Sequence, residues 1–410
     1  MLPEGWKYAN LGEIISHRKG HPFKSNTYKT HGTRVIRISD TTSNSIHSLN
    51  PVFIENNGSE KLDEFTLKHG DIILTTVGSK PHLIDSMVGK AVRIPEEIDG
   101  ALLNQNLVKI SPNDKFIISD ILFLYLKSRN FITYISDLVR GNANQVSISL
   151  KDIFTYRVLL PPLPEQKKIA AILSTWDRAI DGTEKLLANS QQQKKALMQQ
   201  LLTGKKRLPG FTGEWKTVTI GSLLKEVKRP IEWKDDNFYK LLSVKRRSEG
   251  VILREVLHGT KILTKKMNHT KSGDFLISKM QVVHGASGLV PEHLDNHHIS
   301  DSYIALRAKN PEKFDIEFFS WLSKERVMYY KTFLCSYGVT IEKMTFNFNM
   351  YLKENIKIPP TVTEQRSISQ ILNTIENEIT ALESDLSRLR QEKKALMQQL
   401  LTGKRRVTVD

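Results

Sequence analysis

The sequence predicts an α+β protein with two similar mixed α/β globular domains and two long antiparallel helices that pair as a coiled coil. The main observation is a twelve-residue segment, KKALMQQLLTGK, which occurs unchanged at Lys194–Lys205 and again at Lys393–Lys404. Each copy closes a long run of helix-forming residues. Each run follows a region of short strand-like segments. Such internal self-similarity indicates a duplicated architecture.

Each long helix is predicted to begin after a Pro-Pro turn, because proline disfavours helix in the residue before it. Each is predicted to stop at a glycine that is followed by basic residues. The resulting helices have about 40 residues and a length of roughly 60 Å. The landmarks are Pro161-Pro162, Glu165-Gln166 and Gly204 in the first copy, and Pro359-Pro360, Glu364-Gln365 and Gly403 in the second.

Apolar residues recur along both helices in alternating steps of three and four, which is the a/d pattern of a coiled-coil seam. Lys194 and Lys393 interrupt this seam at equivalent places, where an isolated polar group can fix register. The alternative is two unrelated surface helices, each covering its own domain. The seam residues are Leu173, Trp176, Ile180, Leu187, Leu197 and Leu201, matched by Leu372, Ile375, Ile379, Leu386, Leu396 and Leu400.

Connectivity predicts how the parts are ordered. The first domain leads into the first helix and the second helix leaves the second domain, so paired helices must be antiparallel. We therefore expect a pseudo-two-fold, circular arrangement that brings the two chain ends together. The predicted division is domain 1 at 1–160, helix 1 at 161–205, domain 2 at 206–359 and helix 2 at 360–406.

Both globular parts show the same order of short segments. β-branched runs bounded by Gly, Asn or Pro predict strands, and amphipathic runs predict helices. HGDIIL in the first part corresponds to SGDFLI in the second. The predicted strands are 34–38, 71–76, 90–94 and 107–110, then 240–244, 274–278 and 303–306; the predicted helices are 120–130 and 316–324.

Composition narrows the class of protein. The 410 residues carry 60 Lys and Arg against 44 Asp and Glu, a formal net charge of +16. Such an excess favours a polyanionic partner. The single cysteine, Cys335, excludes an internal disulfide framework and suits a reducing cytosol. No apolar run reaches membrane-spanning length, so we expect a cytoplasmic protein.

The repeated Pro-Pro and Glu-Gln turn, followed by a helix ending in KKALMQQLLTGK, resembles the specificity subunit of type I restriction–modification enzymes of prokaryotes. The resemblance implies two target recognition domains, each reading half of a bipartite DNA site. It implies that the helices act as a spacer and dock two methyltransferase subunits, which nuclease–translocase subunits join. It implies no catalysis on this chain, with S-adenosylmethionine, ATP and Mg bound by partner subunits. Thr361-Val362-Thr363 departs from the usual Leu-Pro of the turn.

Motifs of catalysis are missing from the sequence. No P-loop and no Asn/Asp-Pro-Pro-aromatic motif of an amino-methyltransferase is present. The spacing of His284, His293, His297 and His298 matches no zinc pattern, which leaves solvated or DNA-facing histidines. Two alternatives stay open: an enzyme with its own methyltransferase or nuclease centre, and a coiled-coil adaptor that binds proteins.

DNA-contacting residues are expected on loops, with Arg and Lys on phosphates and Arg, Asn or Gln on base edges. The basic groups Lys205-Lys206-Arg207 and Lys404-Arg405-Arg406 could contact phosphates or complement the helix ends. The candidates in the first domain are Arg34, Arg37, Lys80, His82, Asn104, Gln105, Asn142, Asn144 and Gln145. In the second domain they are Lys245, Arg246, Arg247, Lys265, Lys266, Lys279 and His284.

Overall fold

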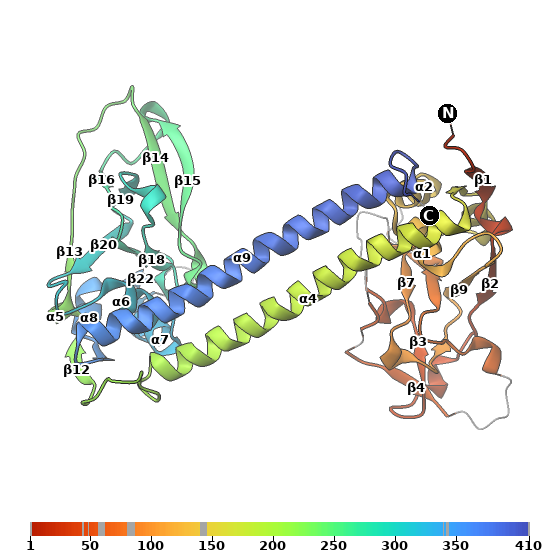
Figure 1. The fold of residues 1–410 in the computed structure, drawn as a ribbon. Helices are drawn as coiled ribbons and strands as arrows, with labels where there is room; N and C mark the ends of the chain where they lie inside the picture. The colour runs from red at the N-terminus through yellow and green to blue at the C-terminus, as the bar shows by residue number, and fades with distance from the viewer. Residues whose placement is uncertain are drawn as a thin grey trace. The chain divides into compact units, whose positions relative to one another are not determined.

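The computed structural model describes residues 2–42, 45–47, 49–55, 62–79, 87–139, 146–338, 340–341 and 344–408. The chain forms two compact units, one of residues 1–182 and 386–410 and the other of residues 183–385. Each unit holds a sheet-rich domain and part of both long helices, α4 (Leu163–Leu201) and α9 (Val362–Leu401) (Figure 1). The predicted α+β class, with two sheet-rich domains and two long helices, is confirmed.

Unit 1 carries the first sheet-rich domain. Its elements are β1 (Lys7–Asn10), β2 (Ile15–Lys19), β3 (Thr33–Ile36), β4 (Val52–Ile54), β5 (Ile72–Thr75), β6 (Val77–Gly78), β7 (Ala91–Arg93), β8 (Leu102–Leu103), β9 (Leu107–Pro112), α1 (Ser119–Lys127), α2 (Arg129–Leu138), β10 (Val146–Ser147), α3 (Leu150–Phe154) and β11 (Arg157–Leu160).

Unit 2 carries the second sheet-rich domain. Its elements are β12 (Lys216–Thr219), α5 (Ile220–Leu223), β13 (Leu224–Glu226), β14 (Phe238–Val244), β15 (Val251–His258), β16 (Met267–His269), β17 (Phe275–Ser278), β18 (Ser287–Leu289), β19 (His298–Ser300), β20 (Tyr303–Ala308), α6 (Ile316–Ser323), α7 (Arg326–Leu334), β21 (Ser336–Tyr337), β22 (Thr345–Phe346), α8 (Phe348–Lys353) and β23 (Asn355–Ile358).

The two domains share a topology. An antiparallel four-stranded sheet has the order β2-β9-β5-β7 in unit 1 and β13-β20-β17-β18 in unit 2. A second sheet, β4-β3-β8 or β15-β14-β19-β16, contains one parallel pair, β3 with β8 or β14 with β19. A two-stranded ribbon, β1 with β11 or β12 with β23, leads to the start of each long helix.

Every predicted strand corresponds to an observed one, and both predicted domain helices exist as α1 and α6. The helix predicted at 120–130 is wrong at its end, because Ser128 leaves helical geometry and starts a second helix. Its backbone ψ is 150° and its side chain accepts a hydrogen bond from the Phe131 N–H. Serine is a preferred helix N-cap for this reason. The prediction missed α2, α7 and the short helices α3, α5 and α8.

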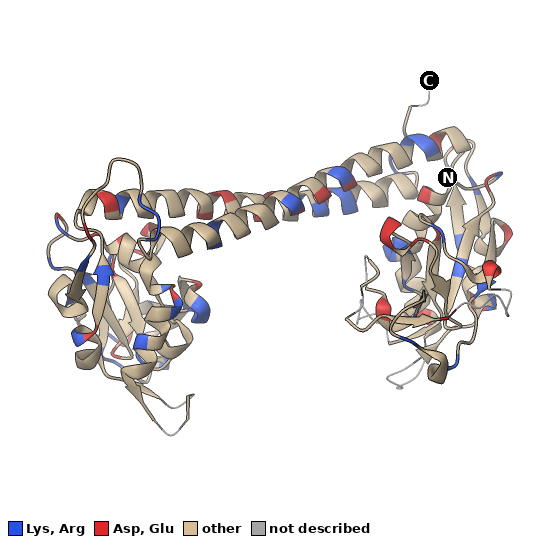
Figure 2. Cartoon of the chain, turned by 90° about the horizontal axis from the view of Figure 1, so that it is seen from below, with Lys and Arg blue, Asp and Glu red and all other residues tan. Residues whose placement is uncertain are grey.

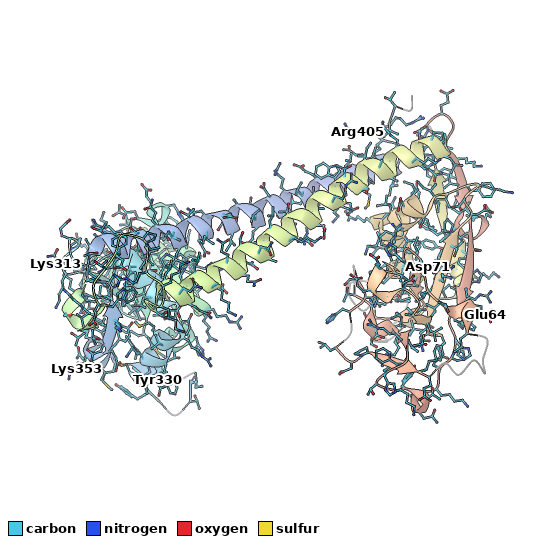
Figure 3. All side chains as sticks on the ribbon, turned by 60° about the horizontal axis from the view of Figure 1, so that its bottom comes forward. Glu64, Asp71, Lys313, Tyr330, Lys353 and Arg405 are labelled. Atoms are coloured by element: carbon cyan, nitrogen blue, oxygen red, sulfur yellow. The ribbon has the colours of Figure 1, made fainter. Side chains whose placement is uncertain are left out.

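The Gly-Asp motif before β5 and β17 builds the same turn in both units. Gly70 and Gly273 have φ of 85° and 78°, which favours glycine. The carboxylates of Asp71 (labelled in Figure 3) and Asp274 each accept a backbone N–H from three residues earlier, at 2.9 and 2.8 Å. Asp274 is fully buried.

The glutamine of each Pro-Pro and Glu-Gln turn joins the long helix to its own domain. The Gln166 side chain donates to the Pro161 and Phe116 carbonyls at 2.9 and 2.8 Å and accepts the Ile118 N–H. In unit 2, Gln365 donates to the Pro359 carbonyl at 3.2 Å and accepts the Asp315 N–H. Both glutamines are buried, so their polar groups need these partners.

The glutamate of each turn pairs with an arginine that follows the end of the other long helix. In unit 2, the Arg207 guanidinium donates twice to Glu364, at 2.6 and 2.7 Å. In unit 1, Arg406 makes the same bidentate pair with Glu165, whose carboxylate also accepts from the Trp6 indole. Each residue of one pair lies 199 positions from its counterpart in the other. We call these two contacts the crossed ion pairs.

The helices are antiparallel within each unit. In unit 1, Lys393 pairs with Asp177 while Arg406 pairs with Glu165. In unit 2, Lys194 pairs with Glu376 while Arg207 pairs with Glu364. In both units the later residue of one helix meets the earlier residue of the other. The seam lysines therefore each hold a carboxylate on the facing helix.

None of the twelve predicted seam residues is exposed. Those near the domains join the main core of their own unit, because the start of one helix and the end of the other pack there together. The compact units divide each helix at 182/183 and 385/386, so the four-part division of the chain stays a prediction. Buried are Leu173, Leu201, Leu372, Ile375, Ile379, Leu386 and Leu400; half-buried are Trp176, Ile180, Leu187, Leu197 and Leu396.

Arg207→Ala should destabilise unit 2, because it leaves the Glu364 carboxylate, which is 1% exposed, without its cation. We expect a loss of about 3 kcal/mol in the free energy of unfolding, measured by urea denaturation of the full chain. The matched control is Lys205→Ala, an exposed residue two positions away. Replacing both partners, Arg207→Met with Glu364→Leu, should recover most of the loss. Equal stability of the Arg207 and Lys205 variants would contradict the assigned role.

Candidate nucleic-acid interface

The basic cluster of unit 2 forms where three loops meet. Lys245, Arg246 and Arg247 follow β14. The Arg246 Nε donates to the Gln281 side chain at 2.8 Å, which ties this turn to the loop after β17. Lys279 on that loop donates from its backbone to Ser302 at 2.9 Å and from its ammonium to the Asp301 carbonyl at 2.6 Å. His284 lies on the same loop, so five predicted residues share one edge of the domain.

In unit 1 the corresponding edge lies after the parallel strands β3 and β8. Arg37 and Asn104 directly follow these strands, and the Asn104 N–H donates to the Ile36 carbonyl at 3.1 Å. Gln105 comes next and is exposed, whereas the side chain of Asn104 is buried. Arg34 lies within β3 and is half-buried. Four predicted residues are therefore neighbours, although they differ in exposure.

Arg37 is held by its own domain. Its guanidinium donates to both carboxylate oxygens of Asp40, at 3.1 and 3.0 Å, and to the Asn50 carbonyl at 2.9 Å. The hydrogen bond with Asp40 raises the pKa of Arg37. Because Asp40 is buried, this pair is part of the scaffold. Asp40 also accepts the Arg37 N–H at 2.8 Å and so closes the turn.

Lys265 and Lys266 lie away from the basic cluster. The Lys265 ammonium pairs with Asp235 at 2.8 Å, and this bond is the main reason why the pKa of Asp235 is lowered. Asp235 precedes β14, whereas Lys245 follows it. Seven strand residues, roughly 23 Å at 3.3 Å each, separate the two sites. Lys80, His82, Asn142, Asn144 and Gln145 lie outside the described residues.

Two of the basic residues that follow the long helices are bound within the protein. Arg207 and Arg406 bind the buried glutamates of the crossed ion pairs. Lys205, Lys206, Lys404 and Arg405 are exposed, and Arg405 is labelled in Figure 3. Along the helices, Lys and Arg are mixed with Asp and Glu (Figure 2).

Two histidines of unit 2, His297 and His298, are less exposed than the sequence predicted. His297 is buried, with its Nδ1 2.8 Å from the Asp295 carbonyl, so the expectation of a solvated or DNA-facing ring is wrong for it. Burial, followed by the nearby His269 ring, lowers the pKa of His298. In the described part of the chain, no three His, Cys, Asp or Glu side chains gather to hold a metal ion. Nor has any described helix the length and hydropathy of a membrane span.

The twelve-residue repeat lines a hollow in each unit. In unit 1, a hollow of about 530 Å³ lies between the last turns of α9 and the start of α2. In unit 2, one of about 470 Å³ lies between α4, α9 and the turn before α7. The same three repeat residues line both. They are Lys394, Met397 and Gln398 in unit 1, and Lys195, Met198 and Gln199 in unit 2.

Sequence reasoning missed Gln281 and Ser248, which hold the basic cluster together. The Ser248 N–H donates to the Gly285 carbonyl at 2.9 Å, joining the turn after β14 to the loop that carries His284. The only signal in the sequence was position, because Gln281 lies between two predicted residues and Ser248 follows another.

Comparison with known proteins points in one direction. The family model described as "Type I restriction modification DNA specificity domain" matches residues 3–189. The type I restriction enzyme MjaX specificity subunit of Methanocaldococcus jannaschii is 26% identical, over 99% of this chain and 95% of its own. The MjaVIII specificity subunit of the same organism is 28% identical, over 50% of this chain and 48% of its own.

A solved structure shares the fold. The type I restriction–modification S subunit of M. genitalium aligns with a TM-score of 0.62 and 13% identity, covering 96% of both chains. The resemblance inferred from the repeated motif is therefore confirmed. Over nearly its whole length, the chain is similar to a specificity subunit of a type I restriction enzyme.

Proposed function

We propose that each unit recognises one half of a bipartite DNA target, as the DNA-specificity subunit of a type I restriction–modification assembly. The observation that supports this most is a shared scaffold with different loops at one edge. After the parallel strands, unit 1 presents Gln105 beside the fixed Arg37, whereas unit 2 presents the basic cluster around Lys245. Different side chains on equivalent loops would read different bases.

Seven of the described candidates divide into two groups by their side-chain hydrogen bonds. Gln105, Lys245, Arg247 and Lys266 are exposed and suited to contact DNA. Arg37, Lys265 and Lys279 are bound within their own domain, so we assign them first to holding the loops. The net charge of +16 would supply the sequence-independent part of the affinity through phosphates.

The repeat suggests two copies of one partner. Core packing explains why Leu197 and Leu201 are the same in both copies of the repeat, and the ion pair with Glu376 explains Lys194. Neither explains why exposed residues of the repeat are also identical in both copies. Lys195 and Gln199 are exposed, as are Lys394 and Gln398, and both sets line a hollow. We assign these hollows to two methyltransferase subunits, with nuclease–translocase subunits joining the assembly.

In this proposal the chain carries no catalysis, and S-adenosylmethionine, ATP and Mg bind partner subunits in the cytoplasm of a prokaryote. A protein-binding adaptor is the second candidate, because the hollows alone would also suit it. DNA binding separates the two functions.

The full chain should select a split sequence from a random duplex library, with two short half-sites and an unread gap. Binding should weaken by about 10³-fold or more between 50 and 200 mM salt, because several phosphates release counterions. Fluorescence anisotropy on the selected duplex measures both. Binding that is indifferent to sequence and salt would contradict the proposal and favour the adaptor.

Arg37→Ala and Gln105→Ala should separate scaffold from recognition. The first removes the partner of buried Asp40, so we expect unit 1 to melt at a lower temperature. The second changes an exposed side chain, so its Tm should stay unchanged while discrimination at one base pair falls by about 1–3 kcal/mol. Thermal denaturation and binding to single-base variants of the duplex measure the two effects. Loss of discrimination without loss of stability in Arg37→Ala would reverse these roles.

Gln199→Arg should reduce the methyltransferase subunits bound per chain from two to one, and Gln398→Arg should do the same. The double variant should bind none, because each change places a bulky cation in a hollow while keeping helix propensity. Native mass spectrometry of the co-expressed complex counts the copies. Gln192→Arg, an exposed change on the same helix outside the repeat, is the control. Two copies on the double variant would exclude the hollows as docking sites.

A further inference from the structure

The turn after β14 adopts an unusual backbone conformation. Arg247 and Ser248 have φ of 58° and 56°, in the left-handed region that few residues other than glycine occupy. Two successive residues of this kind carry a conformational cost, and such strain persists only where surrounding contacts enforce it. Among the described residues other than glycine, Asn296 alone shares a positive φ with them.

Two hydrogen bonds and one close approach of a glycine enforce the turn. The Ser248 N–H donates to the Gly285 carbonyl at 2.9 Å, and the Ser248 and Tyr329 hydroxyls share a hydrogen bond of 2.6 Å. Gly285 has a φ of 75°, and a Cβ there would lie 2.2 Å from the Tyr329 hydroxyl. The packing of the turn against the loop after β17 and helix α7 therefore requires this backbone conformation.

The equivalent turn of unit 1 is built in the ordinary way. It follows β3 at Ile38–Asp40, its preceding residue Arg37 has a φ of −107°, and its arginine is bound to Asp40. In unit 2 the arginine at the tip, Arg247, is exposed. The strained turn is thus a difference between two domains that otherwise share a scaffold.

We propose that Arg247 reads a guanine in the half-site recognised by unit 2, and that Ser248, Tyr329 and Gly285 are the residues that position it. A guanidinium matches the O6 and N7 acceptors of guanine in the major groove. A phosphate contact needs positive charge but no fixed presentation, so it does not explain a strained turn. A turn that is already ordered lowers the entropy lost when the arginine binds. This inference depends on the proposed function.

The test uses the full chain and the duplex selected from the random library. In Arg247→Ala, discrimination at one guanine of one half-site should fall by about 5- to 150-fold, corresponding to a lost bidentate contact. Arg247→Lys keeps the charge but not the fork, so it should lose the same discrimination with a smaller loss of total affinity. The other half-site should be read as before.

Ser248→Ala and Tyr329→Phe should weaken discrimination at that same guanine although Arg247 is present. Thermal denaturation identifies any variant that fails to fold, and the two changes act on opposite ends of one hydrogen bond. Arg254→Ala on β15, an exposed arginine of the same domain, is the control and should keep full discrimination.

If Arg247→Ala weakened binding to every duplex equally, Arg247 would contact phosphate and the inference would be overturned. Unchanged binding to all duplexes would overturn it as well. Unaltered discrimination in both Ser248→Ala and Tyr329→Phe would remove the positioning role. A wild-type chain without sequence preference would instead contradict the proposed function, so the two failures are distinguishable.

Discussion

The crossed ion pairs are the constraint on which the helical part of this molecule depends. A carboxylate buried at the start of one long helix needs a cation, and the nearest is an arginine just past the end of the other. An apolar seam tolerates a shift of one helix along its partner, but a buried charge does not tolerate the loss of its counterion. Polarity and register of the helices in each unit are therefore fixed by charge as well as by apolar packing.

The same turns also connect the helices to their domains. Adjacent residues of the Glu-Gln pair do different work: the glutamate reaches the other helix, and the glutamine holds the carbonyls of its own Pro-Pro turn and the backbone before α1 or α6. Two buried polar side chains in succession thus orient a helix against a sheet-rich domain. Because both are fully satisfied, their burial specifies a geometry at little net cost.

Because the two domains are built on the same scaffold, their loops can differ while the scaffold stays the same. Asp71 and Asp274 close the same turn, and Asp99 and Asp295 accept equivalent backbone N–H groups at 2.6 and 2.7 Å. These contacts lie away from the loops after the parallel strands, where the units differ. Side chains on those loops can vary with little effect on the core, which suits the proposed reading of a different half-site by each domain.

From the sequence alone, the long helices, seven of the strands and the relationship between the halves could be predicted, because periodicity, proline pairs and glycine stops are local signals. The break at Ser128 was missed because serine is tolerated inside a helix as well as preferred as an N-cap. The partners of Glu165, Arg37 and His297 could not be predicted, because the chain ends, loop closures and burial that decide them are tertiary. The candidate site shows the same division, because the sequence indicated basic and amide residues but not their surroundings. The fold decided that Arg37 is bound to Asp40 and that Asn104 is buried. It also decided that Lys265 lies at the other end of β14 and that Arg247 is exposed on a strained turn.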